Sequence, residues 1–336
     1  MVGRSIAIVG GLNMDMIFSV DRVPDVGESK DALSLVQCPG GKGANTAVAA
    51  YRASHFKPSR EGRASQHGSG TAGEDIQVFM NGAVGTDAFG SQLKQQLEVN
   101  GVDTTAVRTL EGEVSGTCCV FVEKKTGESR NMAYQGANLK WTPVETNSVT
   151  CFGGDQKPDL IVLHLGIPAE VVEGVLATAA KKGVDTLLNP SPAVPLNNST
   201  YRNLTHLLLN ESEAALLSGE SLENFTGPAA WQKAGLFFIR LGVKNVVITL
   251  GAKGAFYATH QGEIGHVDAE KDITVVDATG AGDTFVGTYA VGYVRSKQLG
   301  KWNIAKAVKR ACRASAMTIQ HFGAQESIPW SDEIDK

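Results

Sequence analysis

The sequence predicts an α/β fold, with a mostly parallel central sheet flanked by helices on both faces and a small additional β-sheet. Beyond Gln135, short apolar runs alternate with amphipathic runs of helical period, which is typical of parallel strands joined by covering helices. Residues 16–38 and 115–134 read as β-runs and turns outside this alternation, so we assign them to the small sheet. Gly-rich turns precede helices near both ends of the chain, and α/β proteins commonly bind anions at such helix N-termini.

The composition is that of an ordinary globular enzyme. The 336 residues are 42% hydrophobic and 20% charged, and we expect a single domain over residues 1–336. The net charge of −4 favours neither a nucleic acid nor a membrane as a partner. No Cys-x-x-Cys spacing occurs, so we interpret the cysteines as reduced thiols of a cytoplasmic protein, with a nuclear pool left open. They are Cys38, Cys118, Cys119, Cys151 and Cys312.

A polar loop follows the first predicted strand, residues 5–10. Asn13 and Asp15 in this loop offer amide and carboxylate groups that suit hydroxyl groups of a ligand. The alternative is that Asn13 and Asp15 only form a turn, as Asn and Asp commonly do in loops. The run from Gly10 to Asp15 lacks the Gly-x-Gly-x-x-Gly spacing of nicotinamide dehydrogenases, which argues against that class.

A second Gly-rich turn, residues 39–45, leads into an Ala-rich helix at 46–54. It is not a Walker A loop, because Lys42 is followed by Gly43 rather than by Ser or Thr. Residues 55–75 are almost without apolar side chains, so we expect an exposed, mobile loop there.

The middle of the chain supplies the core. We expect strands at residues 76–84, 160–165, 184–188, 204–209 and 246–250, and helices at 88–100, 169–182 and 231–241. Asn210 and Glu213 have the spacing of a helix capping box. Residues 249–254 form, by spacing alone, a turn at the end of a strand.

The run from Val276 to Phe285 is the strongest candidate for chemistry. We expect a strand at residues 273–276 and a helix at 284–294, so the turn between them sits at a helix N-terminus. Unpaired backbone N–H groups and the helix dipole favour negative charge there, and Asp283 lies at the same point. The alternative is that Asp283 only caps the helix.

Two strings carry a family resemblance. Asp-Ala-Thr-Gly-Ala-Gly-Asp at 277–283 and Gly-Gly-Lys-Gly-Ala-Asn at 40–45 resemble the two signatures of the ribokinase-like (phosphofructokinase-B type) carbohydrate kinases, with Ala278 where Thr is usual. The resemblance implies that Asp283 is the catalytic base. It implies an anion hole of Gly280, Ala281 and Gly282. It implies a sugar site of Asn13, Met14, Asp15, Gly41, Lys42, Gly43, Ala44, Asn45 and Asp283.

The same resemblance implies sites for ATP and for two cations. The implied ATP contacts are Asn210, Glu213, Thr249, Leu250, Gly251, Ala252, Lys253, Gly254, Gly282 and Asp283. Glu213 would hold Mg²⁺ through water, and the implied K⁺ site comprises Asp277, Thr279, Thr318, His321, Gly323 and Ser327. The small sheet would act as a lid over the sugar and as a contact between two copies in a homodimer.

The implied activity is ATP-dependent phosphorylation of D-ribose at its 5-hydroxyl, giving ribose 5-phosphate. One departure concerns the sugar: the family usually carries a Glu two residues before Pro168, and this chain has Gly166 there. Loss of a buried hydrogen-bond partner costs about 1–3 kcal/mol, which weakens the case for tight ribose selectivity. The alternatives are a kinase of this family for another sugar or a nucleoside, and a catalytically weak sugar-binding protein.

Overall fold

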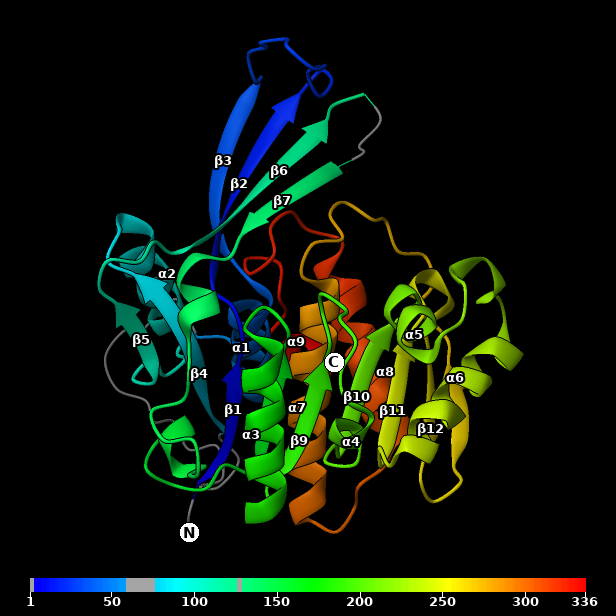
Figure 1. The fold of residues 1–336 in the computed structure, drawn as a ribbon. Helices are drawn as coiled ribbons and strands as arrows, with labels where there is room; N and C mark the ends of the chain where they lie inside the picture. Colours follow the sequence, from blue (N-terminus) through cyan, green and yellow to red (C-terminus); the bar gives the residue numbers. More distant parts are fainter. Residues whose placement is uncertain (1–2, 59–75, 126–128) are drawn as a thin grey trace.

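The computed structural model describes residues 3–58, 76–125 and 129–336, and it confirms the α/β fold (Figure 1). Within those residues, nine strands form the central sheet in the order β13-β12-β11-β10-β9-β8-β1-β4-β5. All neighbours are parallel except β11–β12 and β12–β13. The strands are β1 (Arg4–Val9), β4 (Ile76–Gly85), β5 (Val107–Leu110), β8 (Leu160–His164), β9 (Asp185–Asn189), β10 (His206–Asn210), β11 (Asn245–Thr249), β12 (Ala255–Thr259) and β13 (Ile264–Val267).

Each face of this sheet buries its own hydrophobic core. Strand β1 shows why, since Ile6 and Ile8 belong to one core and Ala7 and Val9 to the other, as the alternation of side chains along a strand requires. The first core is covered by α1 (Lys42–Ser54), α2 (Ala88–Val99), α7 (Ala281–Gln298) and α8 (Ile304–Thr318). The second is covered by α3 (Ala169–Lys182), α5 (Glu211–Ser218) and α6 (Pro228–Leu241). Two short helices, α4 (Asn198–Tyr201) and α9 (Ser331–Ile334), complete the set described.

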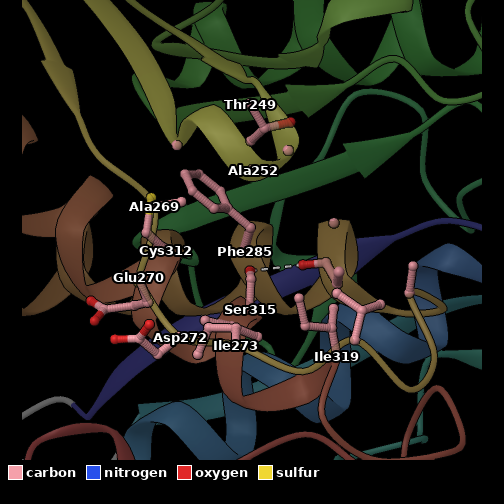
Figure 2. Close-up of a pocket in the computed structure, with 17 residues that line it drawn as sticks. Thr249, Ala252, Ala269, Glu270, Asp272, Ile273, Phe285, Cys312, Ser315 and Ile319 are labelled. Atoms are coloured by element: carbon pink, nitrogen blue, oxygen red, sulfur yellow. Dashed lines mark hydrogen bonds between the residues drawn. The ribbon is translucent and has the colours of Figure 1, made fainter.

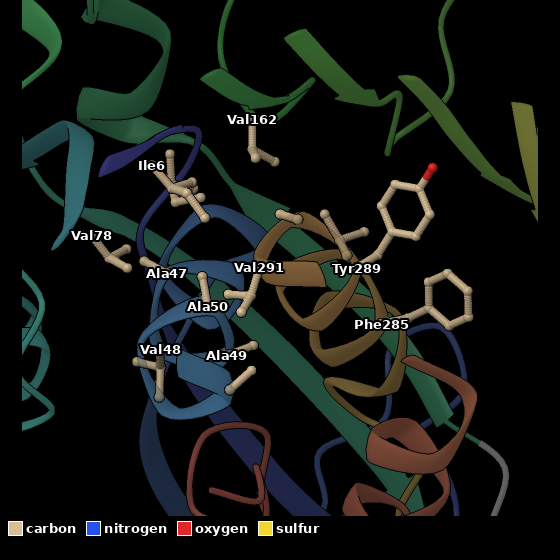
Figure 3. Close-up of a cluster of buried hydrophobic side chains, with 14 of the residues drawn as sticks. Ile6, Ala47, Val48, Ala49, Ala50, Val78, Val162, Phe285, Tyr289 and Val291 are labelled. Atoms are coloured by element: carbon tan, nitrogen blue, oxygen red, sulfur yellow. The ribbon is translucent and has the colours of Figure 1, made fainter. Parts of the chain in front are cut away.

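Helices α1 and α7 pack closely together in the first core (Figure 3). A Cβ added at Gly287 of α7 would lie 2.6 Å from the backbone nitrogen of Ala50 in α1 and 2.8 Å from the carbonyl oxygen of Thr46. Only glycine fits such an approach of two backbones. This packing brings the N-termini of the two helices to the same place, and both of them follow Gly-rich turns.

The small sheet projects from one end of the core (Figure 1). Its order is β3-β2-β6-β7, formed by β3 (Ser34–Gly40), β2 (Asn13–Val20), β6 (Gly116–Glu123) and β7 (Ser129–Tyr134). The outer pairs are antiparallel and β2–β6 is parallel. Between β1 and β2 lie only residues 10–12, and Gly41 alone separates β3 from α1. The base of the small sheet is therefore tied directly to the core.

The predicted strand at residues 273–276 is wrong. The segment is a loop, joined to the chain after α8 by the backbone N–H groups of Val276 and Asp277, which both donate to the carbonyl of Ile319. Val275 and Val276 are 62% and 58% exposed, so these apolar residues do not cover the core. Ile273 and Val275 instead line a large cavity.

Residues 59–75 of the predicted 55–75 loop lie outside the described residues. In the part of the chain that is described, no helix is long and apolar enough to cross a membrane.

Candidate active site

Asp283 lies in the first turn of α7 and is only 6% exposed. Its Oδ2 accepts a hydrogen bond of 2.9 Å from Nδ2 of Asn45, near the start of α1. The close packing of α1 and α7 explains why residues so distant in sequence meet here. A buried carboxylate held by an amide is an acceptor of fixed position, which suits a group that takes up a proton.

The turn before Asp283 presents backbone N–H groups to the same place. Gly280 is the N-cap of α7 with φ 80°, and a Cβ there would lie 2.6 Å from the carbonyl oxygen of Ala324, so glycine is required. At a helix N-terminus the first N–H groups, here including those of Gly282 and Asp283, have no carbonyl four residues earlier within the helix. Together with the helix dipole they form a site for an anion.

On the side of the small sheet, Asn13 is fixed by a buried asparagine. Nδ2 of Asn138 donates to Oδ1 of Asn13 at 2.8 Å and to the carbonyl of Leu12 at 3.0 Å. Oδ1 of Asn138 accepts from the backbone N–H of Leu12 at 3.0 Å. Asn138 is fully buried, so it sets the orientation of the Asn13 amide at the base of β2.

Asp15 stands two residues along β2, and its carboxylate lies against Gly40 of β3. A Cβ added at Gly40 would clash with Oδ2 of Asp15, so the glycine makes room for the carboxylate. Burial, with a smaller effect from the negative charge of Asp283, raises the pKa of Asp15 to about 7, and Lys42 opposes the shift. Cys38 and Cys118 pair with Asp15 on the neighbouring strands, and burial raises the pKa of each thiol to about 11.

Helix α1 begins at Lys42, and the Gly-rich turn before it packs against the β1–β2 turn. Gly41 is the N-cap with φ 91°, and a Cβ there would lie 2.7 Å from the backbone nitrogen of Asn13. A Cβ at Gly43 would lie 2.7 Å from the carbonyl carbon of Gly10. Met14 and Ala44 are 2% and 1% exposed, and their side chains pack in the first core.

A small cavity of about 60 Å³ lies beside Asp283. The carboxyl ends of β9, β10 and β11 supply one wall and the first turns of α1 and α7 supply another. Its polar lining is Lys42, Asn189, Ser191, Asn210, Glu213, Thr249 and Asp283. This convergence of strand ends and helix N-termini is the usual ligand site of an open α/β sheet.

The capping box predicted at the start of α5 is present. The backbone N–H of Glu213 donates to Oδ1 of Asn210 at 2.8 Å, and the backbone N–H of Asn210 donates to Oε2 of Glu213 at 2.9 Å. One carboxylate oxygen of Glu213 is thus engaged in the cap. The second carboxylate oxygen of Glu213 takes no part in the cap, and Glu213 also lines the small cavity.

A larger cavity of about 520 Å³ adjoins the first and shares Thr249, Gly282 and Phe285 with it. Its lining is mainly apolar, and Figure 2 shows Phe285, Ile273 and Ile319 at its wall. Such a volume and lining suit the base and ribose of a nucleotide. Gly282 at the start of α7 lines both cavities and Asp283 beside it contacts Asn45, so the N-terminus of α7 lies between the larger cavity and Asn45.

Not every predicted ATP contact lines this cavity. Thr249, Gly251, Ala252, Gly254 and Gly282 do. Leu250 is 1% exposed in the second core. Nζ of Lys253 instead forms an ion pair of 3.0 Å with Oε1 of Glu211 and lies 5.9 Å from the centre of the Trp231 ring.

The predicted K⁺ residues come from two segments that the fold joins. Oδ1 of Asp277 accepts from the N–H of Thr279 at 2.9 Å, and Oδ2 accepts from the N–H of Gly323 at 3.0 Å. Oγ of Ser327 donates to the carbonyl of Gly323 at 2.5 Å. Thr318 is fully buried whereas His321 is exposed. These oxygen atoms beside the α7 N-terminus are the ligand type that a hard cation prefers.

Several residues of the site were not predicted. Asn138 lies in a short 3-10 helix and holds Asn13, and Asn189 and Ser191 lie at and just beyond the end of β9, where they line the small cavity. Gln325 was also missed, although Nε2 of Gln325 donates to Oδ1 of Asn45 at 3.1 Å. The sequence feature that could have identified these residues is a polar side chain at the end of a strand or in a loop that contacts the Gly-rich turns.

Gly166 lies at the exit of β8, where the family resemblance implies an acidic side chain. A Cβ at this position would meet nothing nearer than the backbone nitrogen of Gly11 at 3.4 Å, so the backbone leaves room for a side chain that this chain lacks. The site therefore has one hydroxyl acceptor fewer than the resemblance implies.

The comparisons with known proteins agree with this geometry. Residues 4–331 match the model of the pfkB family carbohydrate kinases. The ribokinase of Schizosaccharomyces pombe is 34% identical, with 98% of this chain and 96% of that protein covered. The ribokinase of Bacillus subtilis is 30% identical, with 99% of each chain covered. The solved ribokinase of Arabidopsis thaliana, in complex with ribose and ATP, superposes with a TM-score of 0.81 at 25% identity, covering 99% of this chain and 98% of that one. The chain thus belongs to the pfkB family of carbohydrate kinases.

Proposed function

We propose that this protein is an ATP-dependent ribokinase, which transfers the γ-phosphoryl group of ATP to the 5-hydroxyl of D-ribose. The observation that carries the proposal is the position of the Asp283 carboxylate. It is buried at the N-terminus of α7, held by Asn45, between a nucleotide-sized cavity and the polar base of the small sheet. The match to curated ribokinases over nearly the whole chain supports the choice of substrate.

The sugar would be held by amide and carboxylate groups at the base of the small sheet. Asn13, oriented by Asn138, and Asp15 present an amide and a carboxylate from β2. Asn45 presents the second N–H of its amide, because the first is engaged by Asp283. Several fixed hydrogen bonds would place the primary hydroxyl within reach of Asp283. The reacting groups are then already oriented when the reaction begins, which lowers its entropic cost.

Asp283 would take the proton as the primary hydroxyl attacks the γ-phosphorus, while the bond to the β-γ bridging oxygen breaks and ADP leaves. Charge on the transferring group would be stabilised by the N–H groups at the start of α7 and by Lys42. Since these donors are fixed before the reaction, little reorganisation accompanies charge transfer.

Two cations fit the residues present. Glu213 lines the small cavity and has one carboxylate oxygen outside the capping box, so it would suit water-mediated contact with Mg²⁺, which neutralises phosphate charge when bound with ATP. The oxygens of Asp277, Gly323 and Ser327 suit K⁺. Because these residues adjoin Gly280 and Ala281, a cation there would order the anion hole without contact with substrate.

The small sheet would close over the sugar and exclude water from the transferring phosphoryl group. We also propose that it joins two copies of the chain, because Leu35, Val36, Met132 and Tyr134 expose 42–67% of their surface on β3 and β7. Sedimentation analysis at micromolar protein would detect the homodimer. A monomer at all concentrations would refute this point.

ADP release with a panel of sugars, with Mg²⁺ and with or without K⁺, tests the function. We expect turnover that depends on ribose and rises with K⁺, whereas fructose, deoxyribose and adenosine give less. Gly166 favours the second candidate, a kinase of this family for another sugar or a nucleoside. Turnover with another member of the panel would establish that candidate, and no turnover with any sugar would refute both.

A further inference from the structure

We propose that Gln325 is a positioning residue for phosphoryl transfer, acting through Asn45 on the carboxylate of Asp283. The inference rests on the proposed function and adds a residue to its machinery. Gln325 lies in the loop between α8 and α9, and it is 1% exposed. It contacts neither cavity, so it acts on the reaction only through another side chain.

The buried side chains of Asp283, Asn45 and Gln325 form a row joined by two hydrogen bonds. Asp283 accepts from Nδ2 of Asn45 at 2.9 Å, and Oδ1 of Asn45 accepts from Nε2 of Gln325 at 3.1 Å. Asp283, Asn45 and Gln325 are 6%, 5% and 1% exposed, so water has little access to replace either bond. Such buried bonds are directional and stronger than their exposed counterparts.

The direction of the row is fixed by the charge at one end. An ionised carboxylate only accepts hydrogen bonds, so Asn45 must turn its NH₂ group to Asp283. Its carbonyl oxygen then faces Gln325, which must also present an NH₂ group. The reversed amide of Asn45 would place one oxygen against another. Gln325 therefore holds Asn45 in the orientation that donates to Asp283.

The loop that carries Gln325 is itself fastened to α1. Nη1 of Arg52 donates to the carbonyl oxygens of Gln325 and Ile328, each at 2.8 Å. Arg52 and Asn45 belong to the same helix, so the backbone of Gln325 is held at a constant place relative to Asn45. A side chain on such an anchored backbone can fix its partner within the tolerance that catalysis requires.

The side-chain carbonyl oxygen of Gln325, Oε1, shows that packing alone does not explain a glutamine at this position. Among the described residues, Oε1 of Gln325 is buried without a hydrogen-bond partner. An unpaired buried carbonyl lowers stability, and an apolar side chain of similar size would remove this one while leaving Oδ1 of Asn45 without its donor. A residue that lowers stability yet supplies one directed donor to the site is typical of a functional role.

The test is Gln325→Met, which keeps the volume and removes the donor. We expect kcat at saturating ribose and ATP to fall about 10-fold, because the base is no longer held in place. KM for ATP should stay unchanged, and the melting temperature should change little, because one unpaired buried carbonyl, Oδ1 of Asn45, replaces another, Oε1 of Gln325. Gln320→Met is the matched control, because Nε2 of Gln320 donates only to the carbonyl of Ala316 at 2.9 Å, away from Asp283.

Two further variants separate positioning from packing. Gln325→Glu places a second carboxyl group against Asn45, whose single NH₂ group cannot donate to both Asp283 and residue 325, and we expect a larger loss in kcat than in Gln325→Met. In the background Asn45→Ala, Gln325→Met should cause no further loss, because its effect passes through Asn45. Additive losses, or a kcat within twofold of wild type in both Gln325 variants, would overturn the inference. Absence of turnover in the wild type with any sugar would instead overturn the proposed function, and the inference with it.

Discussion

If Asp15 binds the sugar as proposed, ribose affinity will depend on pH. Burial raises the pKa of this carboxyl from 3.8 to about 7 in the protein without ligand. Sugar hydroxyls donate best to the ionised form, so affinity is full above pH 7 and falls as pH drops through it. At pH 5.5 about 3% of the carboxyl is ionised, and the dissociation constant for ribose should be about 30-fold higher than at pH 8.

Calorimetric titration with ribose alone, from pH 5.5 to 8.5, measures this effect without interference from the chemical step. Asp15→Asn should bind ribose weakly and show no such pH dependence. Asp25→Asn is the control, because Asp25 is an exposed acid of the loop beyond β2, paired with Arg22 at 3.3 Å. A wild-type dissociation constant that changes less than threefold over this range would refute the reasoning.

The same carboxyl affects stability with a defined sign. Because folding raises the pKa of Asp15, its contribution to stability is full below pH 3.8 and declines as pH rises through about 7. The upper limit of this decline is about 4 kcal/mol, and partial exposure of the site reduces it to about 1–2 kcal/mol. Asp15→Asn should therefore stabilise the unliganded protein more at pH 8.5 than at pH 5. An equal gain at both values would contradict the shifted pKa.

Three other substitutions test separate parts of the site. Asp283→Asn should lower kcat by about 10²- to 10⁴-fold, since it removes the base, while nucleotide binding followed by calorimetry stays near wild type; turnover within tenfold of wild type would exclude Asp283 as the base. Glu213→Gln should raise the Mg²⁺ concentration needed for half-maximal rate, with little loss of stability because the amide oxygen still closes the capping box, and an unchanged Mg²⁺ titration would argue against the assignment. Arg52→Met should cost about 3 kcal/mol in urea unfolding, because the buried carbonyls of Gln325 and Ile328 lose their donor; a cost below about 1 kcal/mol would show that water replaces it.

The sequence predicted those parts of the protein that local patterns determine. Gly41 and Gly280 have φ of 91° and 80°, and such positions are recognisable because glycine before a helix is locally unusual. The capping box of Asn210 and Glu213 is likewise a local pattern, and it was found where expected. The roles assigned to these residues in binding stay predictions until they are tested.

The parts that were missed depend on contacts between distant segments. Gln325 meets Asn45 across 280 positions, and Asn138 meets Asn13 across 125. No periodicity in the sequence reports such a meeting, because it is created by the packing of whole elements. The strand predicted at residues 273–276 is wrong for a related reason. Ile273 and Val275 line the larger cavity, and from sequence alone such apolar residues resemble the core face of a strand.

The two connections that tie the small sheet to the core are also parts of the proposed sugar site. Residues 10–12 lead into Asn13 and Asp15, and Gly41 precedes Lys42 and Asn45. If the small sheet closes over the sugar as proposed, it turns about the same short segments that hold the sugar. A change that broadens sugar selectivity would then also change how readily the site closes when no sugar is present. On this proposal, selectivity and wasteful ATP hydrolysis are coupled traits, and engineering one would require correcting the other.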